Sequence, residues 1–394
     1  MAISLSYSIP YIFAFLFIFT ITARDIQWIS HGNSSNIKVR IILISFYLFF
    51  IGCRGFLHTD WVVYYPEFQK LPVLWNLGNY QFSDMVWEPG FSLYSIIIKS
   101  FFPSYYAWVF IGTLIDILII DYLLKNNLKY YALGFIFFYS FFTMYEINLL
   151  RNSKAIMLFF LSLQYAERNS YGRYLLINLI GLTFHTSALI YLCIYPILKI
   201  HFNRTFLISF FLVGVTVFIL QIQWCSGILS FIGENLKIGR MWLLLRYIEH
   251  SESSILSIGF IERTFTFIFL FWNRNKIENH SRFGHIIYNC YLLYFFFYFY
   301  FSEFGVFSDR FSTLFILSYC FVYPIAFQYT KKNKLIFIFI MFIYMFLKEL
   351  IGNRDILNKY SNIFFGVESY EERMKDAFKS KPYLQDRYYY QLYN

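Results

Sequence analysis

Charged residues are scarce in this sequence. Only 14% of its 394 residues are Asp, Glu, Lys or Arg, whereas 58% are hydrophobic and 24% are aromatic. Together with a mean hydropathy of +0.51, this composition excludes an ordinary soluble globular protein. Lipid is therefore the solvent for most of the chain, and the few charges are the first place to look for function.

Several chemical signatures are also missing. The five cysteines lie singly, with no CxxC pair and no Cys/His cluster at metal-ligand spacing, so we expect no structural disulfide and no zinc site. The motifs GxxxxGK[ST], GxGxxG, HExxH and GxSxG do not occur, which leaves nucleotide-driven transport, Rossmann cofactors and hydrolase chemistry without support. No cofactor is predicted, and no tight carboxylate cluster demands a divalent metal.

Long apolar runs predict an all-α polytopic membrane protein. In hydrocarbon every backbone polar group must be satisfied internally, and these runs lack the alternation of a barrel strand. The first run, 8–22, is expected to be retained, because no small-residue cleavage site follows it. We predict about eleven transmembrane helices, within roughly 10 to 13. They lie near 8–23, 41–57, 105–123, 131–147, 153–167, 174–198, 205–223, 255–272, 284–302, 310–328 and 335–351.

Basic residues predict the orientation of these spans. Lys and Arg gather in five short connections, which we assign to the cytoplasm, and these loops explain most of the net charge of +10 without nucleic acid. This topology places the loops 58–89 and 224–254 outside. The run 91–102 is too short to span and is predicted to be re-entrant or interfacial. Around 174–204, the basic residues on both sides of the apolar run look cytoplasmic, which a single crossing cannot explain. A break in the embedded helix near His185 would allow both sides to face the cytoplasm. Residues 1–351 then form one transmembrane domain, followed by a polar, Tyr-rich tail at 352–394.

The outer loop carries the first candidate site. Asp60, Tyr64 and Glu67 would share one face of a short helix on the membrane surface. The opposite face, predicted to dip into lipid, carries Trp61, Tyr65 and Phe68. The alternative is an interfacial anchor whose charges merely touch water.

Charges inside or near the spans supply further candidates. Arg151 and Lys154 open a span from the outer side, where each needs an anionic ligand or a structural pair with Glu146. Arg263 is a second candidate for a buried anion contact. His185 is either a hydrogen-bonded packing residue or a ligand-contacting donor or general base.

Five short motifs follow one another along the chain. They are Arg54 with Thr59-Asp60-Trp61, Tyr64 and Phe68; Glu88-Pro89-Gly90-Phe91; Arg151-Asn152 with Ala155; Phe184-His185-Thr186-Ser187-Ala188-Leu189; and Asp309-Arg310-Phe311. In this order they resemble the EpsG/Wzy-type polysaccharide polymerases, over roughly residues 50 to 330 and without the tail. Members of that family commonly carry Arg-Gln where this chain has Arg151-Asn152.

The resemblance implies a multi-pass glycosyltransferase of the bacterial inner membrane, with a GT-C-like architecture and an active site facing the periplasm. Such an enzyme joins undecaprenyl-diphosphate-linked oligosaccharide repeat units into O antigen, capsule or exopolysaccharide, and a separate chain-length-determining copolymerase is an implied partner. Asp60 would be the base or acceptor-orienting group, with His185 as its rival. Arg54, Arg151 and Arg310 would hold the leaving diphosphate, and Glu88 would orient acceptor hydroxyls or an arginine.

Two other classes of function compete with this prediction. A flippase or transporter of lipid-linked oligosaccharide would also use aromatic and cationic residues, but it should line a central cavity with charge and often shows two related halves. A membrane-bound acyltransferase would need a histidine with an acidic partner, and no carboxylate lies within one turn of His185.

Overall fold

The structure is a computed structural model that describes residues 2–79, 86–226, 257–330, 334–382 and 384. All regular elements in these ranges are helical, apart from three isolated β-bridges. The predicted outer loop 224–254 therefore lies almost entirely outside the described residues. The helices with their bounds are α1 (Ile9–Ser30), α2 (Ile37–Tyr47), α3 (Trp61–Lys70), α4 (Pro89–Phe101), α5 (Tyr105–Asn127), α6 (Tyr131–Asn148), α7 (Leu150–Glu167), α8 (Tyr171–Phe184), α9 (Leu189–Cys193), α10 (Arg204–Leu220), α13 (Ile258–Glu278), α14 (Arg282–Tyr300), α15 (Gly305–Thr313), α16 (Tyr319–Gln328), α17 (Lys334–Gly352) and α18 (Tyr370–Ser380).

Three of the described helical segments are long and apolar enough to cross a bilayer: Leu5–Ser30, Tyr105–Asn127 and Lys334–Gly352. A fourth is possible if the pair Gly305–Thr313 and Ile316–Gln328, bent by 48°, counts as one span. These segments coincide with predicted spans, so the chain is a helical membrane protein. The count of about eleven stays a prediction.

Two predicted irregularities are present. Helix α4 has 13 residues, about 20 Å of helix, which is shorter than the roughly 30 Å hydrocarbon layer. The run 174–198 breaks where α8 ends at Phe184, because His185 takes an extended conformation and only the five-residue α9 follows. The break predicted near His185 is therefore confirmed.

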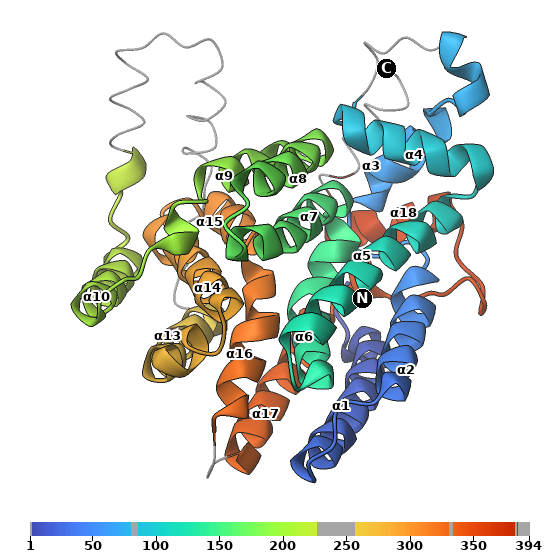
Figure 1. Ribbon diagram of the computed structural model, residues 1–394. Helices are drawn as coiled ribbons and strands as arrows, with labels where there is room; N and C mark the ends of the chain where they lie inside the picture. Colours follow the sequence, from blue (N-terminus) through green and yellow to red (C-terminus); the bar gives the residue numbers. More distant parts are fainter. Residues whose placement is uncertain (1, 80–85, 227–256, 331–333, 383, 385–394) are drawn as a thin grey trace, which may run out of the picture.

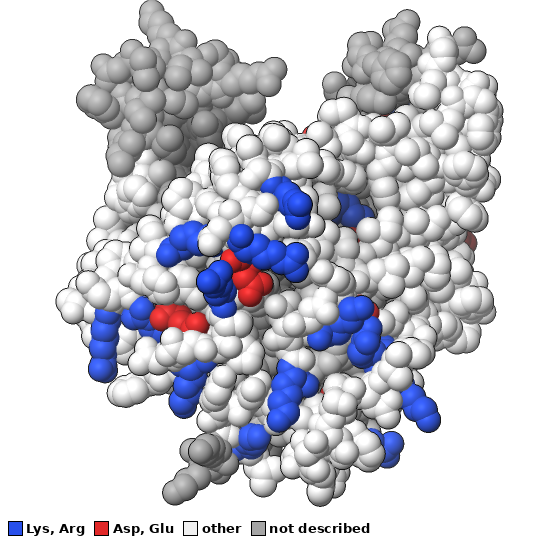
Figure 2. Space-filling model, viewed as in Figure 1, with Lys and Arg blue, Asp and Glu red and all other residues white. Residues whose placement is uncertain are grey.

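The two ends of the bundle differ in charge. In Figure 1 the lower ends of α1, α2 and α17 lie at the same end of the bundle. Lys38 and Lys334 belong to the first turns of α2 and α17. Figure 2 shows Lys and Arg gathered over the middle and lower parts of this face, whereas the upper right, formed by α3 and α4, shows hardly any on its described surface. The basic connections and the outer loop thus lie toward opposite ends.

The apolar residues form two separate cores. The larger is built mainly from α1, α6, α7, α14 and α16 and is rich in buried phenylalanine and tyrosine. The smaller lies under the outer loop, where aromatic residues of α3, α4 and α5 meet the C-terminal segment. Its members include Trp61, Phe68, Trp108, Leu357 and Met374.

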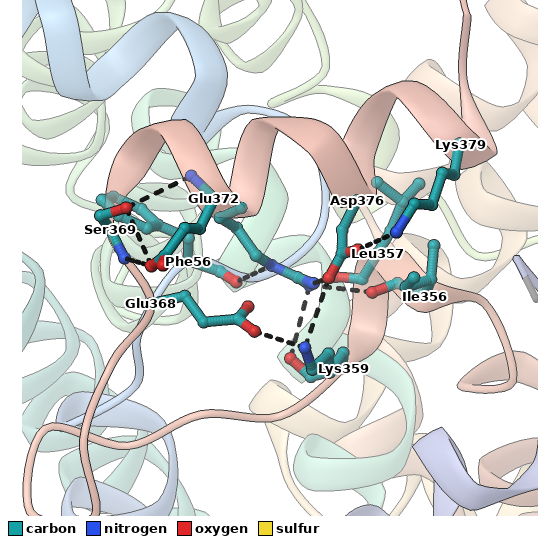
Figure 3. A network of polar contacts seen from close by, with 10 residues as sticks. Phe56, Ile356, Leu357, Lys359, Glu368, Ser369, Glu372, Asp376 and Lys379 are labelled. Carbon is teal, nitrogen blue, oxygen red and sulfur yellow. Dashed lines mark hydrogen bonds and ion pairs between the residues drawn. The ribbon is translucent and has the colours of Figure 1, made fainter.

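The predicted C-terminal tail packs against the outer loop. The backbone N–H of Gly55 donates to the carbonyl of Ser361 at 2.9 Å, and that of His58 donates to the carbonyl of Leu357 at 2.9 Å. The guanidinium of Arg373, which is 2% exposed, donates to the carbonyls of Phe56, Ile356 and Leu357 at 3.1, 2.9 and 2.8 Å. Figure 3 shows these carbonyls converging beside Asp376. Arg373 therefore joins α18 to the loop that carries the candidate site.

We expect Arg373→Met to weaken this packing. The substitution keeps an unbranched apolar side chain but leaves the three carbonyls without their donor, and hydrogen bonds to charged groups contribute about 1.5–3 kcal/mol each. The free energy of unfolding should fall by roughly 3 kcal/mol. The melting temperature of the detergent-solubilised protein measures this, with Arg354→Met, at an exposed arginine, as the control. Equal melting temperatures for the two variants would contradict the assignment.

Docking of the tail should also depend on pH through His58. Burial lowers the pKa of His58, although its hydrogen bond to Asn148 and the charge of Asp355 act in the opposite direction. The unfolded chain therefore binds a proton near its ordinary pKa of about 6.5 while the folded chain does not, so stability is lost as the pH falls through that value. We expect His58→Asn to reduce the fall in melting temperature between pH 7.5 and pH 5.5. Asparagine suits the left-handed backbone of His58, where φ is 64°, and an unchanged pH response would contradict this role.

Candidate functional site

Three of the predicted site residues meet at the outer end of the bundle. Arg151, in the first turn of α7, donates to Glu88 Oε2 at 2.6 Å and to the Tyr64 hydroxyl at 2.9 Å. Glu88 is the residue before α4, and Tyr64 lies in α3. The Arg151 and Glu88 side chains are 29% and 15% exposed, so this ion pair is accessible to a ligand. We call Tyr64, Glu88, Arg151 and His185 the outer cluster.

The Tyr64 phenol stays protonated in this setting. Burial raises its pKa to about 12, against the opposing charge of Arg151. A neutral hydroxyl that accepts from Arg151 keeps its own proton free for donation. Tyr64, which is 5% exposed, is therefore a neutral and largely buried hydroxyl beside Arg151.

His185 enters the cluster from the break after α8. Its Nδ1 accepts from the backbone N–H of Ser187 at 3.2 Å, and the Ser187 hydroxyl donates to Asn152 Oδ1 at 2.8 Å. The charges of Glu88, Arg151 and Arg310 all act on this imidazole. Because Nδ1 is an acceptor here, the proton of the neutral ring belongs on Nε2. His185 is thus set up to donate through Nε2.

Asp60 lies at the edge of the outer cluster, as the residue before α3. Asn148, the last residue of α6, holds it there, because its Oδ1 accepts from the backbone N–H groups of Asp60 and Thr59 at 3.1 and 3.3 Å. The charge of Asp60 acts on Tyr64. The half-buried carboxylate is therefore positioned beside the cluster by an amide that the sequence analysis did not single out.

A second charged group lies deeper between the helices. Lys154 donates to Asp116 Oδ2 at 2.5 Å, and these side chains are only 8% and 0% exposed. Arg54, 3% exposed, donates to the carbonyl of Ile51 at 2.8 Å and to Thr113 Oγ1 at 3.1 Å. Glu146 accepts a hydrogen bond from Tyr47. The alternative pairing of Glu146 with Arg151 or Lys154 does not occur, because Arg151 pairs with Glu88 and Lys154 pairs with Asp116.

A narrow cavity lies beside this deeper group. Phe91, Tyr94, Trp108 and Leu150 line it together with Glu146 and Lys154. Within the described residues, the Tyr94 hydroxyl and Glu146 Oε1 are buried without a hydrogen-bond partner. Lys154 therefore borders a cavity lined mainly by aromatic and apolar residues, and neither Arg54 nor Lys154 belongs to the outer cluster.

The two late arginines occupy different surroundings. Arg310, in α15, is exposed and acts electrostatically on His185. Arg263 donates from Nε to the Tyr294 hydroxyl at 2.6 Å and lies 3.8 Å above the ring of Tyr298. Arg310 is thus an exposed side chain, whereas two tyrosines of α14 hold Arg263.

Trp61 and Phe68 are covered by protein, not by lipid. Trp61 is 4% exposed and packs against Phe56 and Tyr370, while Phe68 is fully buried against Trp108. The prediction that this face of α3 dips into lipid is wrong, because α5 and α18 cover it. Trp61 supports the loop by donating from Nε1 to the carbonyl of His58 at 2.9 Å.

Asp116 is the main residue that the sequence analysis missed. It lies in the middle of the apolar run 105–123, and a single carboxylate at such a position indicates a buried partner. That signal was available in the sequence and would have indicated that Lys154 pairs with a buried carboxylate.

The model of the EpsG family matches residues 37–361. The chain belongs to the EpsG family. No curated protein and no solved structure matches it. Membership of the EpsG family suggests a polysaccharide polymerase and, with the apolar helices, a membrane protein. The predicted resemblance over about residues 50 to 330 is confirmed, and the EpsG match also reaches the docked segment around Leu357.

Gly90 lets α4 approach α8 closely enough to form the outer cluster. A Cβ atom at Gly90 would lie 2.1 Å from Thr183 Oγ1 and 2.9 Å from the backbone oxygen of Thr183. We expect Gly90→Ala to push the start of α4 outward and to separate Glu88 from Arg151. Polysaccharide made by this variant in cells should fall at least about tenfold, because misplacement of a site group by roughly 1 Å costs up to about a hundredfold.

Gly78→Ala is the matched control, since a Cβ atom there meets nothing within 4 Å. Membrane levels of both variants are compared by immunoblot. Normal product from Gly90→Ala would show that the close contact of α4 with α8 is not needed.

Proposed function

We propose that this chain joins undecaprenyl-diphosphate-linked oligosaccharide repeat units on the periplasmic side of the inner membrane. The observation that carries the proposal is the outer cluster, in which Arg151 is shared by Glu88 and Tyr64 next to His185. A half-exposed cation, a carboxylate, a phenol and an imidazole at one membrane surface suit a substrate that is part diphosphate and part sugar.

The proposed reaction transfers the growing chain from its lipid diphosphate to a new repeat unit. The bond between the anomeric carbon and the diphosphate oxygen breaks, and a bond to an acceptor hydroxyl oxygen forms. The proton of that hydroxyl passes to the Asp60 carboxylate. Arg151 and Arg310 stabilise the negative charge on the departing undecaprenyl diphosphate.

His185 and Glu88 have supporting roles in this proposal. His185 Nδ1 is occupied by the backbone N–H of Ser187, so Nε2 donates to a phosphate or sugar oxygen, which favours Asp60 over His185 as the base. Glu88 fixes the guanidinium of Arg151 through their 2.6 Å ion pair. Arg54 and Lys154 are buried and support the site from below instead of binding diphosphate.

The membrane orientation belongs to the same proposal. The outer cluster and the docked tail lie away from the basic connections, which are expected to face the cytoplasm. A GT-C-like arrangement, with α4 at the membrane surface, fits its length of 13 residues. We also propose that a separate copolymerase sets chain length, and that the product is O antigen, capsule or exopolysaccharide.

The test uses a host that lacks its own polymerase. Wild type, Asp60→Asn, Arg151→Ala and His185→Ala are expressed at matched membrane levels, and extracted polysaccharide is separated on a gel. We expect Asp60→Asn to lose the long ladder, because a general base contributes roughly 100-fold to 10,000-fold to the rate. Arg151→Ala should lose it as well, and His185→Ala should shorten it.

Glu67→Gln is the control, since Glu67 shares helix α3 but only forms a surface pair with Lys70 at 3.5 Å. Its ladder should match that of the wild type. A single repeat unit must still reach the surface in every variant. Loss of that single unit would instead indicate a flippase, and an unchanged ladder in Asp60→Asn and Arg151→Ala would refute the proposed site.

A further inference from the structure

A group of metal-ligating side chains lies far from the outer cluster. His201 precedes α10, Glu278 is the last residue of α13, and His285 lies in the first turn of α14. One ligand atom from each of the three lies within 4.8 Å of the others. The group is surrounded by Arg274, Lys276 and Arg282 in sequence and therefore belongs to a connection predicted to be cytoplasmic.

The buried histidine of this group has an unused nitrogen. Its side chain is 9% exposed, and its Nδ1 has no hydrogen-bond partner among the described residues. The nearest carboxylate oxygen, Glu278 Oε1, is 3.6 Å away, which is too far for a hydrogen bond. A buried polar atom without a hydrogen-bond partner lowers the stability of the fold by about 1–3 kcal/mol unless a bound ligand or ion satisfies it.

Glu278 presents one free oxygen to the same space. Arg274 holds Oε2 at 2.9 Å, which leaves Oε1 directed at His285. A carboxylate oxygen is one of the ligand types that zinc accepts.

The third ligand is held in place by α14. Asn289 Nδ2 lies 3.1, 3.2 and 3.0 Å from the carbonyls of Ile197, Leu198 and Ile200, so the segment just before His201 is fixed to the helix that carries His285. The two imidazole rings lie 3.9 Å apart. This contact is thus built by the packing of the chain, although His201 itself is exposed.

We propose that His201, Glu278 and His285 bind a zinc ion. Two imidazole nitrogens and one carboxylate oxygen are a common zinc ligand set, and a water molecule would complete the tetrahedron. Bond lengths of about 2.0–2.2 Å require the ligand atoms to draw together by roughly 1 Å or more. The two imidazole rings are stacked with 23° between their planes, so the exposed His201 ring must also rotate to bring a nitrogen lone pair onto the ion. The ion would tie the segment before α10 to the α13 and α14 hairpin. The site would lie at the end of the bundle opposite the proposed polymerase site.

The test measures zinc directly. Full-length protein without an affinity tag is purified in detergent, stripped with a chelator, reloaded with ZnSO₄ and analysed for metal by mass spectrometry. We expect about one zinc per chain, a higher melting temperature with zinc, and a d–d absorption band when Co²⁺ replaces it.

His201→Ala should weaken zinc binding at least tenfold. Because His201 is exposed, this variant should fold. His31→Ala, at another exposed histidine, is the matched control and should bind like the wild type. Equal zinc content in wild type and His201→Ala, or no stabilisation of the wild type by zinc, would overturn the proposal. The polysaccharide ladder tests the polymerase site independently of this result.

Discussion

A charge enclosed between helices must be neutralised by a neighbour, since removing one ion from water costs several kcal/mol. Lys154 and Asp116 meet this requirement at 2.5 Å, and they join α7 to α5. Residues three apart share one face of a helix, so the same pair brings Arg151 into position one turn above Lys154. There it reaches Glu88 and Tyr64. The partly exposed Arg151–Glu88 pair thus depends on a buried ion pair beneath it.

The helical architecture could be predicted because lipid leaves a backbone few alternatives. Each long apolar run is helical in the described residues, and the conflict among basic residues around 174–204 predicted the break that His185 makes. The number of full crossings could not be predicted in the same way. Short helices such as α4 and α9 form their backbone hydrogen bonds internally at any depth in the membrane, so hydropathy alone does not decide whether they cross it.

The candidate site could be predicted in part for a similar reason. Glu88, Arg151 and His185 interrupt apolar sequence at the predicted outer ends of spans, which made them visible. Their partners were harder to predict, because Arg151 and Glu88 are 63 residues apart and Lys154 and Asp116 are 38 apart. Sequence proximity favoured Glu146 as the partner of Lys154, whereas the packing of α5 against α7 makes Asp116 its partner. His201, Glu278 and His285 escaped the search for a zinc site because their spacing fits no short motif.

The docked tail sets an order of events during biogenesis. Tyr370 and Arg373 contact Val62 and Phe56 across separations of 308 and 317 residues. The loop that holds Asp60 and Tyr64 is made early, yet it cannot complete its packing until α17 has been inserted and the segment after it has reached the same side of the membrane. Contacts of such long range form slowly. The end of this protein that carries the proposed site therefore completes its packing only after the segment around Tyr370 and Arg373 has been made.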